Sequence, residues 1–209
     1  MSNETKRINL GENFFTQAAN ILILNFLCMI CCIPVITIAD SLSSLYYVML
    51  KIVRKQEDGV VKPFFRFFRD NFLKSLPYTL LMILAVLVCL AGFMVFQGGL
   101  GLLLVIPVSI ILTILFGWVI PLFAQFDNTT KQTFENALKL AVEHPEISLV
   151  ILAANGYMTV LFLVLPGVFA YVLYLWDFIG LAVSALIICK QVVPVFDALI
   201  PETKTEETN

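Results

Sequence analysis

Asp177 is the residue with the clearest chemical potential, because it is the only charged residue between Ile147 and Cys189. A carboxylate at the centre of a bilayer costs at least ~2.5 kcal/mol, so Asp177 should face the protein interior and be paired or protonated there. The other apolar runs offer it no Lys or Arg, and its expected partners are neutral side chains, above all Asn155 and Asn25. Two interpretations stay open: these three residues form a proton or solute site, or they fix helix packing through interhelical hydrogen bonds.

A second candidate site combines aromatic and basic side chains. On a helical wheel Phe64, Phe65, Phe68 and Phe72 fall on one arc, whereas Arg66, Arg69, Asp70 and Lys74 fall on the other. This arrangement is typical of a helix that lies in the lipid headgroup layer. The candidate docking residues for anionic lipid or a partner protein are Arg66, Arg69, Lys74, Phe64 and Phe68. The alternative is an anchor that only fixes topology.

The remaining reactive residues predict no enzyme and no cofactor. Cys28 and Cys31 have the spacing of a metal or redox pair, but no histidine or second pair is near them, and cysteine also packs well between helices. His144 precedes Pro145, which prevents the helical pairing of a zinc-binding helix. The sequence contains no phosphate-binding loop and no Gly-x-Ser-x-Gly motif.

The composition indicates which elements must position these residues. Hydrophobic residues make up 60% of the 209 residues and charged residues 13%, against roughly 45–50% and 25% in soluble domains. A soluble fold of this size cannot hide so much apolar surface from water. We therefore expect a single all-α membrane domain over residues 1–209, a polytopic transmembrane helical bundle in the lipid bilayer. The net charge of −2 excludes a typical nucleic-acid binder.

Uncharged stretches locate the membrane spans. No charge occurs in the 52 residues between Lys74 and Asp127, which as one helix would be about 78 Å long, roughly twice what a ~30 Å bilayer core requires. The chain must fold back at the glycines of 97–101, and Leu165–Gly167 breaks a later stretch in the same way. The predicted spans are about 15–39, 76–96, 101–125, 146–165 and 168–190, the interfacial amphipathic segments are 40–72 and 127–142, and 201–209 is a polar tail. Asp127, Thr129 and Thr130 are candidate N-caps for the second interfacial segment.

Lysine and arginine predict the orientation. Segment 51–74 carries seven of them and segment 126–146 carries two, whereas both glycine-containing turns carry none. By the positive-inside rule these two segments and the C-terminus are cytoplasmic, and so are the interfacial helices. A six-span alternative also stays open, in which Pro34 marks a hairpin and 35–53 returns across the membrane. Against it, Asp40 and the serines 41, 43 and 44 would be costly on a lipid-facing helix.

Several short stretches resemble the YesL-like family of bacterial integral membrane proteins, whose function is unknown. They are Asn25–Leu27, Ile33–Thr37, Leu45–Tyr47, Phe64–Phe72 and Phe134–Leu138. The resemblance implies a multi-pass protein of the bacterial cytoplasmic membrane, accessory to carbohydrate uptake or sensing. Its expected partner is a sugar importer permease or a sensor kinase. The alternative is a small solute transporter or channel with Asp177 in the pathway, and the oligomeric state is left open.

Overall fold

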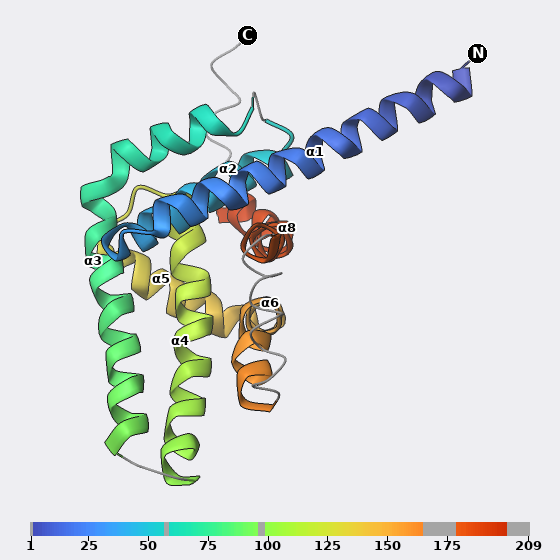
Figure 1. Ribbon diagram of the computed structural model, residues 1–209. Coiled ribbons are helices and arrows are strands. Elements are labelled where there is room, and N and C mark those ends of the chain that lie inside the picture. Colours follow the sequence, from blue (N-terminus) through green and yellow to red (C-terminus); the bar gives the residue numbers. More distant parts are fainter. Residues whose placement is uncertain (1, 57–58, 96–98, 165–178, 200–209) are drawn as a thin grey trace.

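The computed structural model describes residues 2–56, 59–95, 99–164 and 179–199, and in these ranges every regular element is helical. In chain order they are α1 (Ser2–Cys32), the short 3-10 helix η1 (Val35–Thr37), α2 (Ile38–Val53), α3 (Val61–Val95), α4 (Gly99–Gln125), α5 (Thr130–Glu143), α6 (Pro145–Val164) and α8 (Leu181–Leu199). Figure 1 shows the lower part of α3 beside α4, with α6 on the other side of α4, while α1 and α2 cross near the upper ends.

Four stretches are long and apolar enough to cross a membrane: Val35–Val53, Val61–Gly92, Val105–Gln125 and Leu181–Leu199. Thr16–Cys32 and Pro145–Gly156 are shorter apolar helices. The prediction of an all-helical chain with several helices able to span a membrane is confirmed. The choice between five and six spans stays a prediction.

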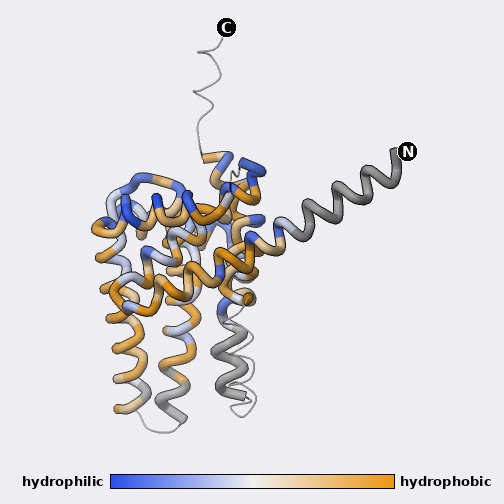
Figure 2. The backbone as a smooth tube through the Cα atoms, turned by 45° about the horizontal axis from the view of Figure 1, so that its top comes forward, coloured by the Kyte–Doolittle hydropathy of each residue, from blue (hydrophilic) through white to orange (hydrophobic). Residues whose placement is uncertain are grey.

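The lower halves of α3 and α4 form an apolar belt. Large hydrophobic side chains project from them into the surroundings, among them Leu80, Leu84, Leu87, Leu103 and Ile111. Hydrophilic residues gather instead at the opposite end of these helices, which we call the basic end because segment 51–74 contributes to it (Figure 2). An exposed belt of this kind is costly in water and suited to lipid.

The first predicted span, 15–39, is not one continuous helix. α1 ends at Cys32, and Pro34 follows with extended backbone angles (φ −74°, ψ 115°). Proline disfavours the helical conformation of the residue before it and lacks the N–H that would continue the helix. In the turn that follows, Thr37 Oγ1 donates a hydrogen bond to the Pro34 carbonyl at 2.6 Å. α1 and α2 therefore form a helical hairpin.

α2 lies at the centre of the packing, where we predicted the start of an interfacial segment. It contacts α1, α3, α4 and α8, and its residues Leu45, Val48, Met49 and Leu50 are buried. Val35–Val53 is also long and apolar enough to cross a membrane, so the interfacial position of segment 40–72 stays a prediction. The amphipathic pattern does not decide the matter, because such a helix can turn its apolar side to lipid or to neighbouring helices.

α3 joins two predicted elements into one helix. It runs without interruption from the second part of the interfacial segment into the span 76–96, with Pro77 inside it. Figure 1 shows α3 bending between these two parts. A proline inside a helix removes one backbone hydrogen bond and bends the axis, so Pro77 accounts for the bend.

Candidate functional site: a buried carboxylate and a basic surface

The predicted site around Asp177 is only partly visible, because Asp177 lies outside the described residues. Asn25 is fully buried, and its Oδ1 accepts a hydrogen bond of 3.0 Å from the backbone N–H of Ala182. Ala182 is in the first turn of α8, where backbone N–H groups have no acceptor within the helix, so Asn25 of α1 supplies one. Asn155 instead donates to the Ile151 carbonyl of its own helix at 3.1 Å. The Asn25 contact therefore joins α1 to α8, whereas the Asn155 contact stays within α6.

The carboxylate of Asp40 is buried in a cluster of polar side chains at the start of α2. Asp40, Ser41, Ser43 and Ser44 are all fully buried at the start of α2. The objection that they would be costly in a lipid-facing helix does not apply, because they face protein. Ser41 donates to the Thr37 carbonyl at 2.8 Å and Ser43 to the Ala39 carbonyl at 2.6 Å.

Asp40 and Ser44 differ from these two serines. Both carboxylate oxygens of Asp40 and the Ser44 hydroxyl lack a hydrogen-bond partner in the described part of the chain. The Ser75 hydroxyl of α3 faces Asp40, but the hydrogen bond it donates goes to the Phe72 carbonyl at 2.8 Å. Buried polar groups are normally paired, so three unpaired oxygens within one helical turn call for an explanation.

No cation of the described residues neutralises Asp40. Arg54 pairs with Asp197 at 2.7 Å and Lys74 with Asp127 at 2.8 Å; the other lysine and arginine ion pairs of the described residues involve Asp70, Glu135 and Glu143. Asp40 does, however, lie in the first turn of α2. The positive end of the helix dipole there favours the negatively charged form of a carboxyl group.

Sequence reasoning did not identify Asp40 as a site residue, although a signal was present. Asp40, Ser41, Ser43 and Ser44 are four polar residues in a helix that is otherwise strongly apolar. We read them only as an argument against a sixth span. Because all four are buried, these polar side chains lie inside the helix bundle.

The predicted docking residues on α3 separate into an exposed and a buried group. The side chains of Arg66 and Arg69 are 80% and 84% exposed, and Phe65 beside them is exposed as well. Together with Lys62 and half-buried Phe68 they line a shallow hollow of about 570 Å³. We call these five residues the basic surface.

Phe64 does not belong to this surface, because its side chain is fully buried. Of the expected arc, Phe64 is buried whereas Phe65 is exposed. Phe67, which is not in that arc, stacks on Tyr47 of α2 with ring centroids 4.5 Å apart. α2 therefore covers only part of the side of α3 that we expected to touch lipid headgroups. Lys74 is exposed but takes part in the ion pair with Asp127.

Arg54 links three helices at the basic end. It follows α2 directly, and its guanidinium donates to Asp197 of α8 and, at 2.7 Å, to Gln125 at the end of α4. Its side chain is only 16% exposed. Arg54 is therefore a structural residue, although the sequence suggested only a loop cation.

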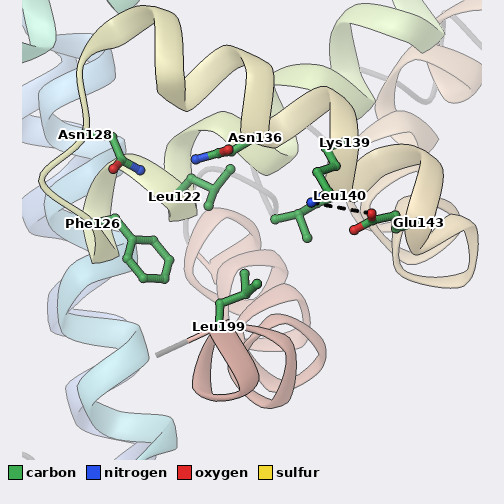
Figure 3. A pocket seen from close by; sticks show the side chains of 8 residues that line it. All are labelled: Leu122, Phe126, Asn128, Asn136, Lys139, Leu140, Glu143 and Leu199. Atoms are coloured by element: carbon green, nitrogen blue, oxygen red, sulfur yellow. Dashed lines mark ion pairs between the residues drawn. The ribbon is translucent and has the colours of Figure 1, made fainter. Parts of the chain in front are cut away.

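A second hollow lies against α5 (Figure 3). It encloses about 250 Å³, and its lining comes from α4, α5, α8 and the loop before α5: Leu122, Phe126, Asn128, Asn136, Lys139, Leu140, Glu143 and Leu199. Lys139 and Glu143 form an ion pair of 3.8 Å on its rim. Thr129 caps α5, since its hydroxyl accepts from the N–H of Gln132 while the Gln132 side chain accepts from the N–H of Thr129. This confirms Thr129 among the predicted caps.

Comparison with known proteins gives one match. Residues 21–93, roughly a third of the chain, match a family described as "Protein of unknown function, DUF624". The matched stretch contains both Asp40 and the basic surface. The search of curated proteins and the search of solved structures each found no match.

Proposed function

We propose that the protein is a non-enzymatic accessory or regulatory subunit that acts by contact with another membrane protein. The basic surface carries this proposal. Arg66 and Arg69 both approach the single carboxylate of Asp70, at 3.9 and 3.4 Å, so the surface keeps an excess of positive charge. An exposed aromatic ring beside exposed arginines is the composition that protein interfaces favour.

The place of the basic surface favours a partner that is itself in the membrane. The surface lies on α3, and the same helix carries the apolar belt in its other half. Contact with a membrane-embedded partner could extend over both parts. In the proposed orientation the basic end is cytoplasmic, as the positive-inside rule predicts.

For the partner we propose a permease of a sugar importer or a sensor kinase for carbohydrate use. The likeness of the sequence to YesL-like proteins supports this choice, and the matched family of unknown function is compatible with it. The hollow against α5 offers a second contact on the same end of the bundle.

The test is site-specific photocross-linking in bacterial cells grown on an inducing polysaccharide. A cross-linker replaces Phe65 on the basic surface or, as a matched control on the same helix, Leu84 in the apolar belt. We expect the probe at residue 65 to capture a permease or sensor kinase component, identified by mass spectrometry, and Arg66→Glu with Arg69→Glu to abolish that product.

The proposal fails if the probe at residue 65 captures only lipid. It fails equally if the same proteins are captured at residue 84, or if the products persist after charge reversal.

A further inference from the structure

We propose that Asp40 and Ser44 form the core of a sodium-binding site inside the helix bundle. The two residues are one helical turn apart on the same face of α2. Their three side-chain oxygens are buried and unpaired in the described part of the chain. Carboxylate, hydroxyl and carbonyl oxygens are the ligands that hard cations take in proteins.

The surroundings supply more oxygen atoms than Asp40 and Ser44 alone. The hydroxyls of Ser41 and Ser43 donate to carbonyls of their own helix, so each hydroxyl oxygen keeps its capacity to accept. The Ser75 hydroxyl approaches Asp40 from α3. The helix also breaks directly before α2, at Pro34, and broken helices form the sodium sites of several membrane transporters.

The charge balance favours a cation with a single charge. A buried carboxylate without a counter-charge costs several kcal/mol, and the described residues provide no lysine or arginine for Asp40. The groups that we find around Asp40 are hydroxyls, with Cys31 of α1 also near it. One sodium ion would cancel the charge, whereas a divalent ion would leave an excess positive charge buried.

A proton would explain the arrangement less well. It would satisfy one of the three unpaired oxygens and would create a donor that needs its own acceptor. The place of Asp40 in the first turn of α2 favours the carboxylate, which opposes the preference of a buried carboxyl group for its neutral form.

The experiment measures the Tm of the purified full chain in detergent at one pH, in NaCl, KCl or choline chloride of equal ionic strength. A ligand that binds only the folded state raises stability with its concentration. We expect Na⁺ to raise the Tm in a saturable way, and choline to have no such effect.

Two variants and a control assign the ion to the site. Asp40→Asn should lose the Na⁺ response and be at least as stable as the wild type in choline, because it removes a buried charge. Ser44→Ala should need about tenfold more Na⁺ for the same shift, since it removes one neutral ligand. Asp70→Asn, which changes a carboxylate on the surface, should leave the response intact.

Several results would overturn the proposal. Equal Tm values of the wild type in all three salts would refute it without any variant. A stabilisation by lower pH in choline, with no effect of Na⁺, would assign the site to a proton. A Na⁺ response that persists in Asp40→Asn would place the ion elsewhere. If Asp40→Asn fails to fold, binding of ²²Na⁺ to the wild type decides, with one ion per chain expected and none refuting the site.

Discussion

Gly117 of α4 lies directly against Ile151 of α6, and replacing it by alanine should destabilise the protein. A Cβ atom at residue 117 would lie 2.1 Å from Cγ2 of Ile151, whereas two carbon atoms in contact prefer about 3.5–4.0 Å. Ile151 is fully buried. The Nε1 of Trp118 also donates to Ser148 at 3.0 Å, so separating the helices would break this bond as well.

The expected loss follows from two opposing effects. Overpacking of this kind costs about 1–3 kcal/mol, and alanine returns about 0.5–1 kcal/mol because glycine is unfavourable inside a helix. Gly117→Ala should therefore lower the free energy of unfolding by roughly 1 kcal/mol, and by about 2.5 kcal/mol at most. The measurement is unfolding in mixed detergent micelles, followed by circular dichroism.

A double variant tests whether Ile151 is the cause. Ile151→Ala alone should cost about 2–5 kcal/mol as a cavity-forming change. It also removes the Cγ2 methyl group with which a Cβ atom at residue 117 would clash. The loss of unfolding free energy in the Gly117→Ala/Ile151→Ala variant should thus be smaller than the sum of the two single losses, by about 1–3 kcal/mol. Simple additivity would refute the close contact.

Gly92→Ala is the matched control. An added Cβ there meets Val105 Cγ2 at 3.6 Å, an ordinary contact, so this variant should be neutral or slightly stabilising. If it is as destabilising as Gly117→Ala, the loss at Gly117 is a general effect of substituting glycine and not a clash.

Three further changes should each weaken one described contact, measured by the same unfolding assay. Asn25→Ala leaves the buried N–H of Ala182 without its acceptor and should cost about 1–3 kcal/mol; an unchanged stability would show that the contact has no energetic value. Arg54→Met removes the ion pair with the half-exposed Asp197 and should cost about 1 kcal/mol or less, an effect that must shrink in high salt. Thr129→Ala removes the cap of α5 and should cost about 0.5–2 kcal/mol, whereas Thr129→Ser should retain most of the stability.

Local sequence signals predicted a large part of the fold. The glycines near residue 99 mark where α4 begins, and Thr129 caps α5 as its position before an amphipathic segment suggests. Arg66 and Arg69 are exposed as the helical wheel predicts. These features depend on residues close together in the chain, so the sequence carries the information directly.

The environment of each apolar face could not be predicted in the same way. Lipid tails are as apolar as leucine, so composition does not distinguish a face that touches lipid from one that touches protein. We therefore placed Phe64 at the membrane surface and residues 40–53 in an interfacial segment, although both are buried in the bundle. The site at Asp40 was missed for the same reason, because Asp40 differs from a surface carboxylate only through the helices that bury it.

Contacts across long sequence separations also have no local signal. Asn25 and Ala182 are 157 residues apart, and Arg54 and Asp197 are 143 apart. Nothing near any of these residues in the chain indicates its partner.

The central place of α2 has a consequence for how the chain is made. α2 is synthesised well before α8, against which it packs. Until α8 is made, the face of α2 that packs on it lacks its protein cover. α2 can therefore complete its packing only after α8 has been synthesised, and until then this face of α2 is open to proteases.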